Sequence, residues 1–196
     1  MLLEKREAFD MATFTRLKSL DDIEEYLDFH AKVLGSGDER TVYDTGLGYV
    51  IKFSRKHDEV NQNKTEAHIA VSGAPVPRVF IHAPDYRWLA VEKVRPLKGK
   101  QIDAEVSAET GGRLKSLDDL HEVLNAALRE SWTADDPAEH QHLEAIHRRL
   151  MAQNDWYMGL FNMVHKHELV IDELHEANWG VNAKGTLVLL DPGVGG

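Results

Sequence analysis

The chain has 196 residues, no cysteine and a formal net charge of −10 at pH 7. This length suits one domain, or one domain with two lobes, and allows a sizeable buried core. The absence of cysteine excludes disulfides, thiolate catalysis and Cys-based zinc sites, and the acidic charge argues against a general nucleic-acid binder. No apolar run approaches the roughly 20 residues that span a bilayer, and the N-terminal residues lack the pattern of a signal peptide. We therefore expect a cytoplasmic protein that binds neither membranes nor nucleic acids.

A helix is predicted to begin at Ser19, in the segment SLDDIEEYLDFHAKVL. Ser19 can cap the helix, acidic residues follow in the first turn, and apolar residues recur at helical spacing as far as Val33. The seven residues RLKSLDD of this region return at 113–119. We interpret the two copies as helix starts that use the same capping chemistry, because a repeat this short is weak support for duplication.

The segment from residue 32 to 97 is typical of a β-meander. Three short β-prone pieces separated by glycines come first, a helix that ends at Gly73 follows, and two more strands lie in PRVFIHAP and YRWLAVEKV. The rest of the chain is predicted to be mostly helical, over 116–130, 137–152 and 155–167, with a final strand in TLVLL.

Residues suited to binding phosphate gather in the predicted meander. Gly35 and Gly37 fall where a strand ends, where glycine lets backbone amides approach a phosphate, although a plain hairpin turn has the same composition. Val42 follows at the spacing of a valine that covers adenine. Lys52 lies in the apolar strand YVIKF, either exposed or pointing inward at a phosphate. Glu66, in the next helix, could hold the lysine ammonium, with Glu59 as its competitor.

Two oxygen-bearing side chains flank the last predicted strand. Asn178 and Asp191 are thirteen residues apart, so a hairpin between them would bring both side chains to the same end. Hard oxygen ligands suit Mg²⁺, which keeps waters and takes phosphate oxygens as further ligands. Glu173 lies five residues before Asn178, where a carboxylate could orient or deprotonate an attacking hydroxyl. Taken singly, Asn178 and Asp191 are also ordinary turn residues.

In order and in type, these segments resemble the motifs of the protein-kinase-like fold. GSGDERTV resembles the glycine-rich loop, VIK the lysine motif of the third strand, VEKV the strand that leads into the adenine-binding hinge, ELHEAN the catalytic loop and DPG the metal-binding turn. The resemblance covers residues 33–193. Within this fold, the last segment is most similar to small bacteriophage-encoded Ser/Thr kinases and to the catalytic loop of aminoglycoside phosphotransferases.

The resemblance implies an ATP site. Lys52 would hold the α- and β-phosphates, Glu66 would pair with the lysine, and backbone groups from Glu92 to Val94 would hydrogen-bond adenine.

It also implies a catalytic centre near the C-terminal end of the matched region. Asn178 and Asp191 would bind Mg²⁺, Glu173 would take the place of the catalytic aspartate, and His175 would lie near the transferred phosphate.

The sequence departs from the kinase pattern at several places. Arg40 replaces the third loop glycine, where its side chain could crowd the γ-phosphate or help neutralise it. Glu173 is one methylene longer than aspartate, and Asp172 would substitute for it if the loop were shifted by one residue. Pro192 replaces the phenylalanine of the metal-binding turn. The sequence ends three residues after Gly193, before the segment that binds peptide substrates in protein kinases.

We therefore expect a two-lobed, kinase-like α+β fold. Its parts would be an N-terminal helical extension at 1–32, a β-rich N-lobe at 33–97 and a reduced helical C-lobe at 98–196. The expected activity is transfer of phosphate from Mg-ATP to Ser or Thr of a host protein, with a homodimer allowed. Two alternatives stay open: a kinase-fold binding protein that inhibits a host partner by contact, and a small-molecule kinase of the aminoglycoside type.

Overall fold

A computed structural model describes residues 8–37, 40–55, 60–128, 137–169 and 171–192. The chain divides into two compact units. Unit 1 comprises Met1–Ala67 with Arg78–Lys93, and unit 2 comprises His68–Pro77 with Val94–Gly196. In the described part of the chain, no helix is long and apolar enough to cross a membrane.

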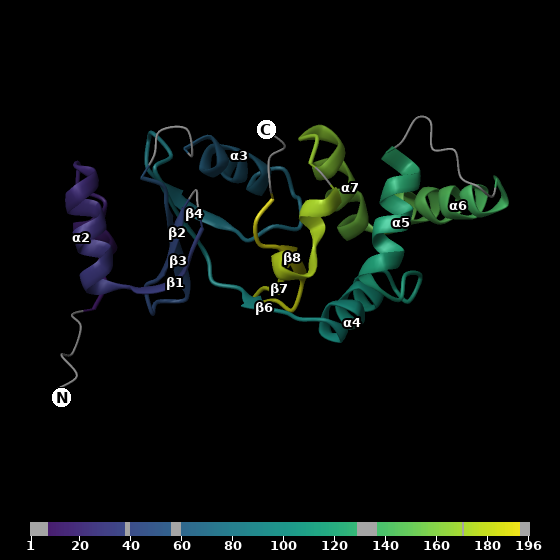
Figure 1. Ribbon diagram of the computed structural model, residues 1–196, viewed down its shortest axis with the longest axis horizontal. Coiled ribbons are helices and arrows are strands. Elements are labelled where there is room, and N and C mark those ends of the chain that lie inside the picture. Colours follow the sequence, from purple (N-terminus) through teal and green to yellow (C-terminus); the bar gives the residue numbers. More distant parts are fainter. Residues whose placement is uncertain (1–7, 38–39, 56–59, 129–136, 170, 193–196) are drawn as a thin grey trace. The chain divides into compact units, whose positions relative to one another are not determined.

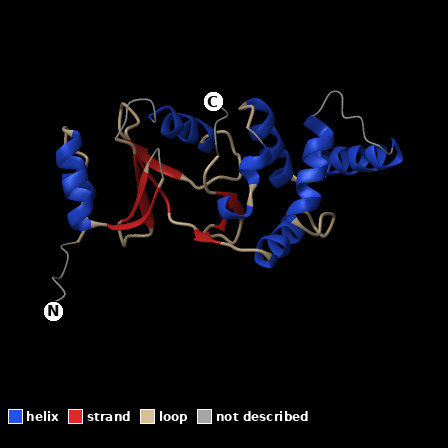
Figure 2. Ribbon diagram, in the orientation of Figure 1, coloured by secondary structure: helices blue, strands red, loops and turns tan. Residues whose placement is uncertain are grey.

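Unit 1 contains a five-stranded antiparallel sheet (Figures 1 and 2). The strands are β1 (Lys32–Ser36), β2 (Thr41–Asp44), β3 (Tyr49–Phe53), β4 (Val79–His82) and β5 (Trp88–Glu92), in the order β1-β2-β3-β5-β4. Helix α3 (Val60–Ala70) connects β3 to β4. The predicted five strands with one helix between the third and fourth are confirmed, and with them the expected α+β architecture with a β-rich N-lobe. The order is not that of a simple meander, because β3 pairs with β5 and β4 lies at the edge of the sheet.

The two faces of this sheet carry different cores because side chains alternate along β3. Ile51 and Phe53 point to the face that packs against α1 (Met11–Phe14) and α2 (Leu20–His30). The other face holds a smaller cluster, in which Val50 packs near Ala67 of α3. Lys52 has the same parity as Val50 and therefore belongs to the face that α3 covers.

The two copies of RLKSLDD begin two helices with the same cap, as predicted. The Ser19 hydroxyl accepts a hydrogen bond from the Asp22 amide at 3.0 Å, at the start of α2. The Ser116 hydroxyl accepts one from the Asp119 amide at 3.1 Å, at the start of α5 (Leu117–Leu128). Each serine therefore satisfies an amide that has no partner within its own helix.

The prediction that the first helix extends to Val33 is wrong. Helix α2 ends at His30, and the next residue, Ala31, is extended with φ −128° and ψ 160°. Val33 belongs to β1, where it pairs with Tyr43 of β2. Backbone pairing across the sheet overrides the helical spacing of this side chain, which local sequence cannot reveal.

Replacing either capping serine with alanine is expected to cost about 1 kcal/mol of unfolding free energy, because a helix amide loses its acceptor. Urea unfolding of Ser19→Ala and Ser116→Ala measures the loss. Ser107→Ala, inside α4 (Lys100–Glu109), is the control. An equal change in all three variants would contradict the capping role.

Unit 2 combines four helices with a small antiparallel sheet among its described residues. Besides α4 and α5 it contains α6 (Pro137–Gln153) and α7 (Asp155–Lys166). The sheet is formed by β6 (Arg95–Pro96), β7 (Trp179–Val181) and β8 (Leu187–Leu189). Its core includes Leu120, Leu124, Leu150, Leu160 and Trp179, all fully buried.

Three of these helices and the last strand were predicted, whereas α4 was missed. This helix begins after Gly99, which has φ 48° and makes no side-chain cap. Only Ile102 and Val106 of α4 are buried, so its apolar stripe is too short to be recognised in the sequence.

Candidate functional site

Lys52 and Glu66 form a buried ion pair in unit 1. The Nζ atom of Lys52 donates to both carboxylate oxygens of Glu66, at 2.7 and 2.9 Å. The Lys52 side chain is 8% exposed and that of Glu66 is 1% exposed. The inward-pointing lysine and its pairing with Glu66, both left open by the sequence, are therefore present. The competitor Glu59 lies outside the described residues.

Val42 lies directly beside Lys52. The two residues pair across β2 and β3, and opposite residues of an antiparallel pair share one face of the sheet. Val42 is half-buried and packs against the cluster around Val50. Val42 of the glycine-loop motif and Lys52 of the VIK motif therefore lie on the same face of the sheet.

Arg40 turns inward and joins the same ion pair. One of its terminal guanidinium nitrogens, Nη1, lies 2.7 Å from Oε2 of Glu66 and donates to Oδ1 of Asn63 at 3.0 Å. The sequence had suggested that this side chain would crowd or neutralise a γ-phosphate. The structure instead places it on the carboxylate that also binds Lys52.

The pKa of Glu66 is set by two opposing effects. Burial raises it, because desolvation disfavours the charged carboxylate, but the charges of Lys52 and Arg40 and their hydrogen bonds outweigh this effect. The pKa of Glu66 is thus held below its ordinary value. Glu66 therefore stays ionised at neutral pH.

Asn63 connects the ion pair to the rest of unit 1. It lies one helical turn before Glu66 on α3 and is completely buried. Its amide nitrogen donates to the Ser54 hydroxyl at 3.2 Å and to the Tyr86 carbonyl at 2.8 Å. Sequence reasoning missed this residue. The available signal was the spacing of Asn63 and Glu66, which places polar side chains at i and i+3 on one helix face.

The two glycines of the predicted loop occupy the end of β1 and the turn after it. Gly35 pairs with Val42, and the Gly37 amide donates to the Arg40 carbonyl at 3.0 Å. A β-carbon at Gly35 would meet no described atom within 4 Å, and one at Gly37 would meet only the Arg40 carbonyl at 4.0 Å. Neither glycine is therefore required by packing within the described residues. Asp38 and Glu39 lie outside them.

Two backbone amides of the segment expected to bind adenine already donate hydrogen bonds within unit 1. The Glu92 amide donates to the Arg78 carbonyl at 2.8 Å, and the Lys93 amide donates to the Gly48 carbonyl at 3.1 Å. These two N–H groups are bound to carbonyls next to the starts of β4 and β3. The predicted adenine contacts would therefore be made by backbone carbonyls or by the Val94 amide.

In unit 2, Asn178 and Asp191 lie at the same end of the β7–β8 hairpin, the arrangement that their spacing predicted. Trp179 pairs with Leu189, and the Leu190 amide donates to the Asn178 carbonyl at 2.7 Å. Asp191 is the next residue and is half-buried. The hairpin thus brings the two oxygen-bearing residues together at the end of its strands.

His175 contacts Asn178 directly. The two side chains are joined by a hydrogen bond of 3.3 Å between His175 Nε2 and the Asn178 amide nitrogen, and the Asn178 backbone amide donates to the His175 carbonyl at 3.0 Å. The side chain of Glu173, the predicted catalytic carboxylate, lies outside the described part of the structure. Its role stays a prediction.

Two residues that sequence reasoning passed over anchor this loop. The buried indole of Trp179 donates to the Leu174 carbonyl at 2.7 Å. A β-carbon at Gly180 would lie 2.5 Å from Cγ1 of Val94 and 2.9 Å from the Arg95 carbonyl, so glycine is required for β6 to approach β7. The letters WG after Asn178 were the signal that could have indicated a close backbone approach.

No family model matches the chain, and a search of curated proteins finds no match. Among solved structures, the ternary complex of streptomycin, ATP and APH(2″)-IIa is similar with 12% sequence identity and a TM-score of 0.38, covering 90% of this chain and 74% of that chain. Choline kinase LicA from Streptococcus pneumoniae is similar with 12% identity and a TM-score of 0.37. That match covers 82% of this chain and 62% of LicA, so this chain spans less than two thirds of its length.

At these TM-scores the structures superpose only loosely. The features that characterise the fold are those of this chain itself. The helix between β3 and β4 was predicted from the sequence, and the buried Lys52–Glu66 pair is the one that the resemblance implied. The chain is therefore an α+β protein, and these features are consistent with the protein-kinase-like fold that its sequence resembles.

Proposed function

We propose that the protein is an ATP- and Mg²⁺-dependent phosphotransferase, most specifically a minimal Ser/Thr kinase that acts on proteins of a host cell. The observation that carries the proposal is the buried ion pair of Lys52 and Glu66 on the same sheet face as Val42. A buried lysine in the middle of an apolar strand is costly unless it is paired, and a phosphate-binding role explains why the charge is kept there.

In this proposal the first unit binds the nucleotide. Lys52 contacts the α- and β-phosphates, and Glu66 keeps its ammonium charged and in place. The glycines at 35 and 37, which packing within the described residues does not require, leave room for backbone amides to approach phosphate oxygens.

The second unit supplies the metal ligands and the base. The oxygens of Asn178 and Asp191 are hard donors, which fit Mg²⁺. With Asn178 and Asp191 as its protein ligands, Mg²⁺ would complete its coordination with water and phosphate oxygens. Bound Mg²⁺ supplies positive charge that stabilises the charge developing on the transferred phosphoryl group.

The reaction exchanges one O–P bond for another. The acceptor hydroxyl oxygen bonds to the γ-phosphorus, the bond from that phosphorus to the β-phosphate oxygen breaks, and ADP leaves. Glu173 orients the hydroxyl and takes its proton. His175 is hydrogen-bonded to Asn178, and the role proposed for it is to contact the transferred group.

The test is phosphate transfer from γ-labelled ATP with Mg²⁺, using purified protein alone and with a bacterial lysate. Asp191→Ala is expected to lower transfer by about a hundredfold or more, because a ligand of the metal is lost. Asp85→Ala, which changes an exposed turn aspartate, is the matched control and should keep full activity. A labelled protein that disappears only in Asp191→Ala supports the proposal, and mass spectrometry then identifies the substrate.

Other results point to the alternatives. ATP consumption stimulated by a hydroxyl-bearing small molecule, with no labelled protein, would replace the protein substrate by a small one. A folded protein that transfers nothing and keeps its biological effect after Lys52→Ala and Asp191→Ala would contradict the enzymatic proposal.

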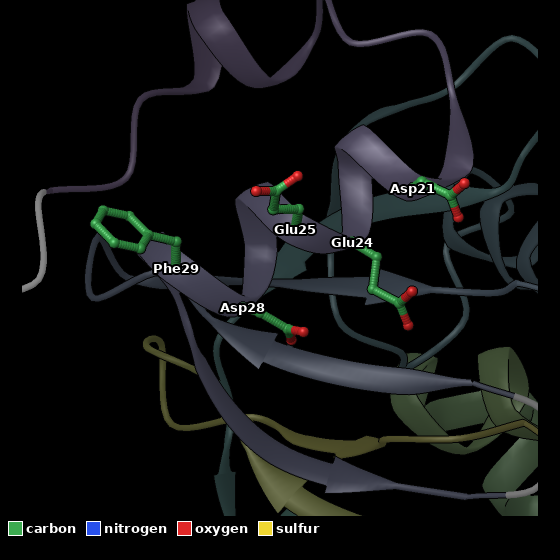
Figure 3. Close-up of a pocket in the computed structure, with 5 residues that line it drawn as sticks. All are labelled: Asp21, Glu24, Glu25, Asp28 and Phe29. Carbon is green, nitrogen blue, oxygen red and sulfur yellow. The ribbon is translucent and has the colours of Figure 1, made fainter.

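A second candidate is a kinase-fold protein that inhibits a basic partner by contact, favoured by an acidic surface on α2. Asp21, Glu24, Glu25 and Asp28 line a hollow of about 550 Å³ together with Phe29, which is 55% exposed (Figure 3). Such a surface attracts positively charged partners. This candidate predicts that charge reversals on α2 abolish the biological effect.

A further inference from the structure

Arg40 is a buried arginine at the point where the chain leaves the glycine-containing turn and enters β2. Its side chain is 5% exposed. Burying a guanidinium costs several kcal/mol unless it is paired in good geometry, so its contacts show what the fold uses it for. The described contacts of its Nη1 atom are both with α3: Glu66 at 2.7 Å and Asn63 at 3.0 Å.

The Glu66 carboxylate is therefore held by cations from two places. Lys52, in β3, contacts Oε1 at 2.7 Å and Oε2 at 2.9 Å, while Arg40 contacts Oε2 at 2.7 Å. The lysine ammonium is a compact charge on a flexible stem, whereas the guanidinium is a rigid planar group with fixed donor directions. Arg40 thus restricts where the carboxylate can lie in a way that the lysine alone does not.

Asn63 extends this restriction by one turn of the helix. Its side-chain oxygen accepts from Arg40, and its nitrogen donates to Ser54 and to the Tyr86 carbonyl. Arg40, which follows the glycine turn, therefore contacts two residues one helical turn apart on α3, Asn63 and Glu66. The described partners of Arg40 and Asn63 in this network all belong to unit 1.

We infer that Arg40 is a positioning residue that fixes Glu66 against Lys52 and ties the segment after the glycine turn to α3, so that the lysine ammonium is in place before nucleotide binds. Its effect on activity rests on the proposed function, since it acts through Lys52. The contact with Glu66 can be tested without any nucleotide.

The first experiment is carbon-13 NMR of the Glu66 carboxyl group and the Lys52 ε-carbon in the nucleotide-free protein, followed over pH. The charged groups that face Glu66 are Lys52 from β3 and Arg40 from the start of β2, and both lower its pKa. Arg40→Met is expected to raise the pKa of Glu66 and to broaden or shift the Lys52 signal. Arg40→Lys, which keeps the charge, is expected to restore part of both.

The matched control is Arg55→Met. Arg55 also pairs with two carboxylates, Asp21 and Glu24 at 2.9 Å each, but its side chain is 56% exposed. Its loss should leave both NMR signals unchanged. Signals in Arg40→Met identical to those in Arg55→Met would overturn the inference, whatever the enzyme does.

The second experiment measures kinetics with ATP and with the acceptor separately. Arg40→Met is expected to raise the KM for ATP about tenfold, as loss of a hydrogen bond to a charged group predicts, with the KM for the acceptor unchanged and Arg40→Lys in between. Equal losses for both substrates would indicate a general structural effect and overturn the inference. A wild-type protein that neither binds ATP nor transfers phosphate would instead refute the proposed function, and the NMR result would still decide the role of Arg40.

Discussion

Lys52→Met is expected to reduce phosphate transfer by about 10²- to 10³-fold, because the substitution removes the charge that would hold the α- and β-phosphates. Methionine resembles lysine in length and needs no partner in the buried position beside Val42. The loss should therefore appear in kcat/KM measured with labelled ATP, while the circular dichroism spectrum stays that of a folded protein.

The control for this prediction is Lys64→Met. Lys64 lies on α3 and is exposed, so its replacement changes net charge by the same amount without touching the ion pair. Retained activity in Lys64→Met with loss in Lys52→Met assigns the effect to the buried lysine. Full activity in Lys52→Met would overturn the assigned role.

Glu66→Ala is expected to destabilise the protein by about 3–5 kcal/mol, because breaking a buried ion pair leaves uncompensated charge in the interior. Two buried cations, Lys52 and Arg40, would lose a shared partner. Urea unfolding at pH 7 measures the change. Glu25→Ala, an exposed glutamate of α2, is the control and should alter the free energy of unfolding by less than about 0.5 kcal/mol.

The contribution of Glu66 should also depend on pH. Its folded-state pKa lies below the ordinary value of 4.5, so the folded protein holds the ionised form more strongly than the unfolded chain does. This stabilisation is complete above pH 4.5 and is lost as pH falls through the folded-state pKa. The free energy of unfolding of Glu66→Gln should therefore fall less between neutral and acid pH than that of the wild type. The same pH dependence in both proteins would contradict the stabilising role of the ionised Glu66.

Several features of the fold could be predicted because they depend on neighbours in the chain. Ser19 and Ser116 cap helices through amides three residues away, and no distant residue is needed. The segment YVIKF, apolar except for Lys52, forms a strand that is buried on both faces, and its β-prone composition is visible in five letters. Asn178 and Asp191 lie at the same end of the β7–β8 hairpin because the turn between the strands returns the chain to its starting end.

Features that depend on packing partners could not be predicted in the same way. The two glycines identified a turn, but the direction of the Arg40 side chain depends on the position of Glu66, which lies on a different element. Gly180 is required because Arg95 of β6 and the preceding residue, Val94, come close to it. Helix α4 gains its stability from burying Ile102 and Val106 rather than from a visible apolar stripe or a cap.

The sequence by itself thus determined the five strands of unit 1, most of the longer helices, the two serine caps and the types of residue available for phosphate and metal binding, since local backbone preferences and side-chain periodicity set them. Only the tertiary structure decided that Lys52 points inward, that Glu66 pairs with it, that Arg40 shares that carboxylate and that Val33 leaves the helix for β1. The physical reason is that the free energy of a buried charge depends on the groups that pair with it, and the free energy of a strand depends on the strand beside it. These partners are far away in the chain and come near only when the sheet and α3 have formed.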